Sequence, residues 1–151
     1  MGKEQGITLI EIMVVLAIIV VLASMAVPFF SQTFENVRLR EAARKVYADL
    51  YQAKVKAMET GGCVKVSFNS STNSYSMSLY NDPKCTVFNS TLGNVSVGDE
   101  FKDVSIANDV EIDFDNMGMT RGGVGSVELK DSKGRTVRVV VSFTGSVRIE
   151  Q

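Results

Sequence analysis

An almost unbroken apolar segment near the N-terminus is the feature that most constrains this sequence. The segment Ile7 to Val27 contains only Thr8, Glu11 and Ser24 as polar members. A helix of this length is about 30 Å long, which matches the hydrocarbon thickness of a bilayer. The pattern predicts a membrane-spanning helix, so any soluble globular fold must be built from the residues that follow it.

The carboxylate of Glu11 separates three interpretations of this segment. A secretory signal peptide would end at a small-residue site such as residues 23–26, but its apolar core would be shorter. A plain membrane anchor fits the length but gives no reason for an acid that costs at least about 2.5 kcal/mol in lipid. In the third interpretation the chain is cut after Gly6, and Glu11 of one subunit pairs with the new α-amino group at Ile7 of a neighbour, which offsets the cost only after assembly.

The stretch GITLIEIMVVLAIIVVLASMAVPFF, residues 6–30, resembles the class III signal of type IV pilins and pseudopilins. The resemblance implies that a prepilin peptidase cuts after Gly6 and methylates the amine of Ile7, and that Glu11 is the assembly glutamate. Two features depart from the family pattern. The first mature residue is Ile rather than Phe or Met, and the leader balances one base with one acid.

The expected organisation follows from this resemblance. Residues 1–6 form a cytoplasmic leader, residues 7–28 a transmembrane helix that later becomes the filament core, and residues 29–151 a periplasmic pilin-like globular domain. Pro28 either ends the helix or kinks it. Because a helical pattern resumes after Pro28, the sequence favours a kink.

A second, amphipathic helical segment follows the apolar one and stops at Gly61-Gly62. Its apolar stripe recurs at steps of three and four and comprises Leu39, Ala43, Val46, Leu50, Ala53 and Ala57. The run RLREAARKVYADLYQAKVKAMETGG, residues 38–62, resembles the GspH/FimT group of minor pseudopilins and pilins. Arg38 and Arg40 could bind phosphate, but the four acids of the same helix favour solvent-facing side chains.

Period-two alternation replaces the helical pattern after Gly62. The predicted strands are 64–68, 75–79, 110–114, 127–129, 136–143 and 147–149. Strands joined by short turns indicate antiparallel hairpins, and one helix before them indicates an α+β domain with the helix packed on an antiparallel β-sheet, the pilin fold. Residues 110–149 again resemble the GspH/FimT pattern.

Two cysteines, Cys63 and Cys85, allow two outcomes. They pair in an oxidising compartment or stay as buried thiols in a reducing one. The periplasmic location implied by the resemblance favours a bridge, which would contribute about 3 kcal/mol. Two soft ligands do not make a metal site.

Several kinds of chemistry are disfavoured by composition. The chain contains no histidine, which removes the usual acid–base and nucleophile-activating partner. We expect no enzyme activity, cofactor or metal. Calcium at Asp113, Asp115 and Asn116 is a minor alternative, because alternation puts both aspartates on the outer face of a strand.

The sequence therefore predicts a minor pilin-like filament subunit acting in type II protein secretion. Its expected partners are other pilin or pseudopilin subunits, prepilin peptidase, an inner-membrane assembly platform and the membrane. The alternative is a minor pilin of a type IV pilus involved in pilus assembly or DNA uptake. Arg138 and Arg148 are the candidate DNA contacts, but a net charge of −1 and the nearby Glu150 disfavour nucleic acid.

Overall fold

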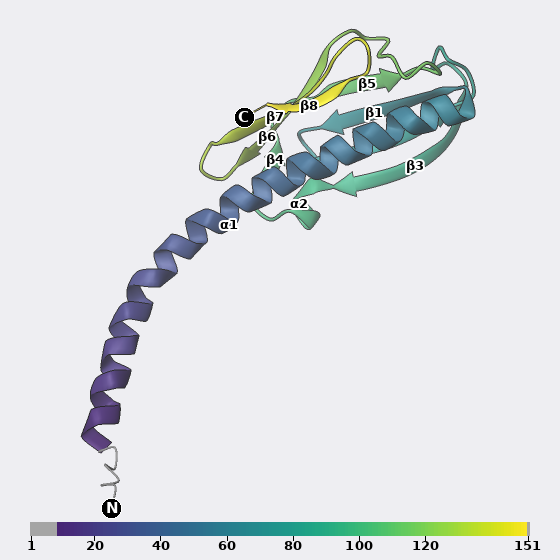
Figure 1. Cartoon of the computed structure of the whole chain (residues 1–151). Coiled ribbons are helices and arrows are strands. Elements are labelled where there is room, and N and C mark those ends of the chain that lie inside the picture. The colour runs from purple at the N-terminus through teal and green to yellow at the C-terminus, as the bar shows by residue number, and fades with distance from the viewer. Residues whose placement is uncertain (1–8, 151) are drawn as a thin grey trace, which may run out of the picture. The chain divides into compact units, whose positions relative to one another are not determined.

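A single long helix precedes all of the β-strands (Figure 1). In the computed structural model, residues 9–150 are described, apart from the side chains of residues 25–36. Helix α1 runs from Leu9 to Thr60. The chain forms two compact units, Met1–Glu35 and Asn36–Gln151, and α1 contributes to both. Within the described residues, no helix combines the length and the apolar character that crossing a membrane requires.

The C-terminal part of α1 is buried along the stripe that the sequence predicts. All six predicted stripe residues are buried, and Ala42 and Asp49 extend the buried face. The helix ends where Gly61 takes a φ of +68°, a left-handed conformation that glycine adopts without a steric penalty. The predicted helix and its stop are confirmed.

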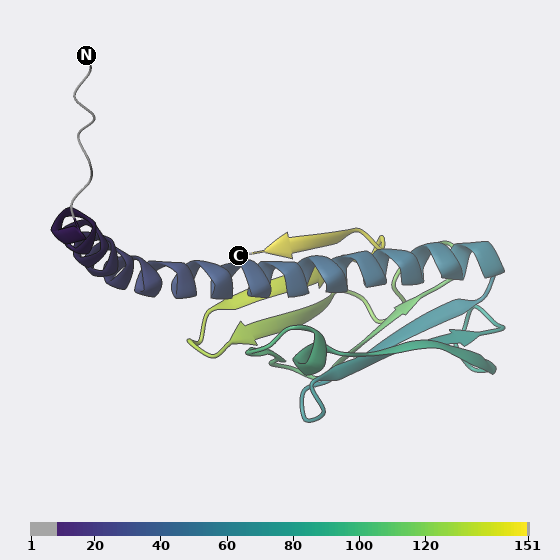
Figure 2. The same ribbon diagram turned by 90° about the horizontal axis from the view of Figure 1, so that it is seen from below.

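Eight strands and one short helix follow α1. They are β1 (Cys63–Asn69), β2 (Ser74–Tyr80), β3 (Phe88–Ser96), α2 (Val97–Glu100), β4 (Val104–Ile106), β5 (Val110–Phe114), β6 (Gly125–Asp131), β7 (Thr136–Val141) and β8 (Val147–Glu150). They form two four-stranded antiparallel sheets, ordered β3-β2-β1-β5 and β4-β6-β7-β8 (Figures 1 and 2).

The second unit is held together by one apolar core. Residues of α1 and of both sheets belong to the same buried cluster, with Leu50, Phe114 and Leu129 among its largest members. The inner faces of the strands supply alternate residues, so that β1 buries Val64, Val66 and Phe68 while the residues between them remain partly accessible. The α+β class and the helix-on-sheet packing are confirmed.

Two features differ from the sequence prediction. The sequence predicts one antiparallel β-sheet, whereas the structure has two. β5 pairs with β1 in the first sheet, and β4 pairs with β6 in the second. In addition, β3, α2 and β4 were not predicted. β3 has exposed and intermediate residues with no apolar alternation, and β4 is only three residues long.

Candidate assembly site

From Leu9 to Ser24, α1 carries apolar side chains at every position except Glu11 and Ser24. Every described side chain from Leu9 to Ser24 is exposed within the single chain, including large ones such as Ile10 and Met13. Such a helix needs lipid or protein around it. Glu11 lies in the first turn of this segment. The predicted cleavage and methylation positions, Gly6 and Ile7, lie outside the described residues.

Pro28 lies within α1, which continues on both sides of it. Its side chain belongs to the set that the structure does not describe, so the kink stays a prediction. The structure thus places Glu11 and Pro28 on one helix.

Cys63 and Cys85 form a disulfide, which confirms the predicted pairing. Cys63 begins β1 and Cys85 lies in the connection between β2 and β3, with their Cα atoms 5.3 Å apart. Asp82 shapes this connection. Its carboxylate accepts hydrogen bonds from the backbone N–H groups of Val87, Thr86 and Lys84, and from the Thr86 hydroxyl, which together lower the pKa of Asp82 to about 2.

A polar cluster that the sequence did not reveal lies between α1 and the first sheet. The buried carboxylate of Asp49 accepts a hydrogen bond of 2.9 Å from Lys45 Nζ and another from the hydroxyl of Tyr75. Burial, followed by the hydrogen bond to Asp49, raises the pKa of Tyr75 well above its usual value. The only sequence signal was the position of Asp49 beside Val46 and Leu50 on the apolar stripe.

A glycine junction fastens two loops to α1. The ammonium of Lys54 donates a 2.9 Å hydrogen bond to the carbonyl of Gly145. A Cβ atom at Gly145 would lie 1.8 Å from the carbonyl oxygen of Gly118, and one at Gly118 would lie 2.8 Å from both Lys54 Cε and Met58 Sδ. Two glycines with positive φ therefore allow the β5–β6 and β7–β8 connections to meet on the helix.

The two candidate DNA-contacting arginines lie on neighbouring strands of the second sheet. Arg138 on β7 pairs with Glu128 at 3.3 Å, and Arg148 on β8 pairs with Glu150 at 3.0 Å. The two arginines thus share their surface with two carboxylates, and the pair carries no excess of positive charge. Arg38 is likewise paired, with Asp103 at 3.5 Å.

The two aspartates at the end of β5 differ, because Asp115 has hydrogen-bond partners in the protein, whereas one buried side-chain oxygen of Asp113 has none in the part of the chain that the structure describes. Asp115 accepts hydrogen bonds of 2.9 Å from the backbone N–H groups of Met117 and Met119. Asp113 is half-buried, and burial raises its pKa although Lys65 opposes the shift. Among residues 9–150, no three acidic, cysteine or histidine residues are grouped so that they could hold a metal ion.

The N-terminal segment and the fold define a class of protein. Residues 1–27 match the prokaryotic N-terminal methylation motif, so the chain is a type IV pilin-like protein. Residues 42–145 match the Type II transport protein GspH family. This match covers more than half of the chain, and the protein therefore belongs to the GspH family of minor pseudopilins, which are structural proteins and not enzymes.

Solved structures of two relatives share the fold. The type IV minor pilin FimU of Pseudomonas aeruginosa is 14% identical, with a TM-score of 0.60 over 78% of this chain and 91% of that one. The minor pseudopilin EpsH from the type 2 secretion system of Vibrio cholerae is 10% identical, with a TM-score of 0.59 over 75% of this chain and 96% of that one. At these identities they establish the pilin fold alone. No curated protein matches the sequence.

Proposed function

We propose that this protein is a minor pseudopilin that works in type II protein secretion after cleavage behind Gly6 and methylation of Ile7. The observation that carries the proposal is the presence in one chain of the N-terminal methylation motif over residues 1–27 and the GspH family over residues 42–145.

Assembly through α1 is the mechanism of this proposal. Before assembly, lipid covers the apolar surface of residues 7–28, and the carboxylate of Glu11 is unfavourable there. When the subunit joins a filament, neighbouring helices replace the lipid, and Glu11 pairs with the methylated amine of an adjacent subunit. The pair between Glu11 and the methylated amine also selects the register of packing.

The partners and the location follow from this mechanism. Prepilin peptidase processes the chain, an inner-membrane platform assembles it, and other pilin-like subunits surround it. The globular domain lies on the periplasmic side. The Cys63–Cys85 disulfide supports this location, because disulfides persist in oxidising compartments.

An intact mass measured on protein from native membranes tests the proposal. We expect a chain that begins at Ile7 and carries one added methyl group. Alkylation of Cys63 and Cys85 is expected only after reduction. A chain that retains residues 1–6, or begins after Ala26, would exclude the pseudopilin pathway.

A minor pilin of a type IV pilus is the second candidate function, and the similarity in fold to FimU favours it. Deleting the gene separates the two. Periplasmic retention of exported proteins supports secretion, whereas loss of surface pili supports the pilus. For DNA uptake, the second unit would have to shift DNA at low salt, and the pairing of Arg138 and Arg148 with carboxylates predicts no shift.

A further inference from the structure

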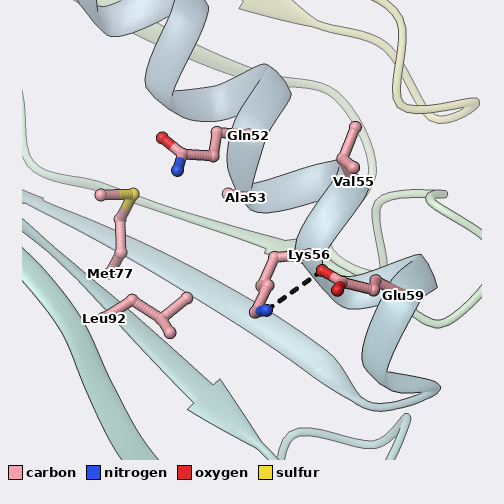
Figure 3. Close-up of a pocket in the computed structure, with 7 residues that line it drawn as sticks. All are labelled: Gln52, Ala53, Val55, Lys56, Glu59, Met77 and Leu92. Atoms are coloured by element: carbon pink, nitrogen blue, oxygen red, sulfur yellow. Dashed lines mark hydrogen bonds and ion pairs between the residues drawn. The ribbon is translucent and has the colours of Figure 1, made fainter.

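Two hollows of the second unit differ in how their charged groups are compensated. The larger hollow, of about 380 Å³, lies between α1 and the first sheet. Lys56 and Glu59 line it and pair with each other at 3.0 Å (Figure 3), so these charges already have partners within the chain. The smaller hollow, of about 190 Å³, lies beside β5 and includes a carboxylate that is not compensated in this way. We name the smaller hollow the β5 cavity.

The β5 cavity forms where the edge of the first sheet meets the second sheet. Within the described residues, β5 pairs with β1 and β6 pairs with β4 and β7, so no strand ladder joins β5 to β6. The connection between them is fixed to the edge of β5 by a 3.2 Å hydrogen bond from the N–H of Arg121 to the carbonyl of Asp113. Residues 110–113 line the cavity together with Thr120 and residues 122–125.

Glycines leave part of the cavity wall without side chains. Gly122, Gly123 and Gly125 line the cavity, and a Cβ atom at either of the first two would meet nothing within 4 Å. The hydroxyl of Thr120 donates a 2.6 Å hydrogen bond to the carbonyl of Gly123 and so holds the loop in place. This part of the wall is therefore backbone, which a group from another molecule can approach closely.

Asp113 is the acceptor in this cavity that lacks a donor. Its Oδ1 atom is buried and has no hydrogen-bond partner within the described part of the chain. Lys65 and Arg121 act on it electrostatically but donate elsewhere. The Lys65 ammonium lies 3.3 Å from the carboxylate of Glu111, and the Arg121 guanidinium lies 3.2 Å from the carbonyl of Pro83. Burial raises the pKa of Asp113 in spite of both cations, so its charge is incompletely compensated.

A guanidinium group has the chemistry that this cavity lacks. It carries a positive charge and five N–H donors in a planar fork, and it is more weakly hydrated than an ammonium, so its burial costs less. The cavity of about 190 Å³ is smaller than the roughly 300–1,000 Å³ of pockets that hold drug-sized ligands, which indicates a single side chain. Residues 9–150 contain no group of three acidic, cysteine or histidine residues that could hold a metal ion, so an organic cation fits better.

We propose that the β5 cavity binds the guanidinium group of an arginine side chain from another protein, with the carboxylate of Asp113 as its acceptor. The charge-assisted hydrogen bond compensates the buried oxygen, and the glycine wall lets the partner's backbone come close. The choice of a protein as the source of the arginine rests on the proposed function, because a pilin-like subunit works by contacting other proteins. The chemistry of the cavity does not depend on that function.

Binding of a blocked arginine tests the site. Full-length protein purified from native membranes in detergent, with its glycines labelled with ¹⁵N, is titrated with N-acetyl-arginine N-methylamide at pH 7. The amide signals of Gly122, Gly123 and Gly125 should shift until saturation, whereas that of Gly61 at the end of α1 should not. Blocked citrulline, which lacks the charge, should cause no shift. Blocked lysine should bind at least about threefold more weakly, because an ammonium lacks the planar fork.

These titrations can overturn the proposal in two ways. If blocked arginine leaves the three glycine signals of the cavity unchanged, the cavity is not a binding site for this group. If blocked lysine binds as tightly as blocked arginine, the assignment to a guanidinium is wrong.

The variant Asp113→Asn separates a binding role from a structural one. It should weaken the binding of blocked arginine by about tenfold or more, because the charge-assisted hydrogen bond is lost. Asp99→Asn removes an exposed charge elsewhere and should bind like the wild type. Without the probe, Asp113→Asn should unfold at the same or a higher urea concentration than the wild type, since it removes an uncompensated buried charge. A lower midpoint would show that a donor within the chain, such as Arg121, serves this carboxylate, and would overturn the proposal.

Free arginine distinguishes a protein partner from a small molecule. Its own carboxylate would lie near Glu111, which also lines the cavity, so it should bind more weakly than blocked arginine. Equal or tighter binding of free arginine would exclude a protein as the source. The intact mass is measured on the same preparation. If the chain begins at Ile7 and no arginine binds, the site is wrong and the proposed function stands. If the chain is not processed, the proposed function is wrong, and the titration still decides the site.

Discussion

At the scale of single residues, the most consequential polar group in the core is the carboxylate of Asp49. It is buried where α1 meets the first sheet, and it depends on Lys45 and Tyr75 for compensation. A buried carboxylate that loses a donor pays the full cost of its desolvation, whereas an exposed one is compensated by water. Substitutions around Asp49 should therefore have large effects on stability.

Tyr75→Phe removes only the hydroxyl group that donates to Asp49. We expect it to lower the free energy of unfolding by about 1–3 kcal/mol, the usual cost of leaving a buried charged acceptor with one donor fewer. Urea denaturation measures this change. Tyr51→Phe, on the exposed side of the helix, is the matched control and should change stability by less than about 0.5 kcal/mol. Equal stabilities of the two variants would contradict the role given to Asp49.

Asp131 should make stability depend on pH. Burial alone would raise the pKa of Asp131. Hydrogen bonds from the Arg135 backbone N–H at 2.9 Å, from the Arg135 guanidinium at 2.6 Å and from the Lys133 backbone N–H have the opposite effect and outweigh burial. The pKa of Asp131 is therefore below its usual value. A folded-state pKa below the unfolded one adds stability at pH values above the unfolded pKa of about 4. That stability is lost as the pH falls through the folded-state pKa.

The variant Asp131→Asn isolates this effect. It should be less stable than the wild type at pH 7 by about 1–3 kcal/mol, and the difference should shrink as the pH approaches 3. Thermal or urea unfolding between pH 3 and pH 7 measures both quantities, with the exposed residue change Asp99→Asn as control. A difference that stayed constant over this range would show that the charge of Asp131 is not responsible.

At the scale of elements, the glycine junction holds two connections against α1. Gly145→Ala should lower the free energy of unfolding by at least about 2 kcal/mol, because its φ of +68° is unfavourable for alanine and its Cβ would meet the carbonyl of Gly118. Gly122→Ala is the control, since its Cβ would meet nothing within 4 Å. Chemical denaturation compares the two, and a larger loss at Gly122 would refute the junction.

The disulfide stabilises the β2–β3 connection. Replacing both Cys63 and Cys85 by serine should cost about 3 kcal/mol, because the bridge closes a loop with a sequence separation of 22 residues. Unfolding of the wild type with and without a reductant should reproduce the difference. If reduction left the unfolding midpoint unchanged, the bridge would not contribute to stability.

The elements that sequence predicted are those that bury one face. α1 was found through its stripe, and β1, β2, β5, β6, β7 and β8 through alternation. β3 escaped because an edge strand rich in serine and asparagine has little to bury. The division into two sheets escaped as well, since alternation tells which face of a strand is buried but not which strand lies beside it.

The features of the candidate site also differ in whether the sequence could predict them. The N-terminal motif could be recognised because its chemistry is local to a few neighbouring residues. The pairing of Cys63 with Cys85 could be predicted only by assuming that the domain lies in an oxidising compartment. The surroundings of Asp49 and the glycine junction depend on contacts between residues far apart in sequence, and no periodicity reports such contacts.

At the scale of the whole molecule, Glu11 should control assembly and not processing. Glu11→Leu removes the unfavourable acid from the membrane, so we expect normal insertion and a normal mature mass. Its recovery in the assembled filament fraction should fall by about tenfold or more, because a neighbour's amine then lacks its partner. Sheared filaments and membranes analysed by immunoblot measure the two pools. Ser24→Ala, on the same helix, should assemble normally.

The path of the chain between the two sheets has a mechanical consequence. The chain enters the first sheet with β1–β3, crosses to the second with β4, returns with β5 and crosses again to finish with β6–β8. Both sheets share one core with α1. We therefore expect that neither sheet separates from α1 without disturbing the other, and that a force applied along α1 is shared between the two sheets.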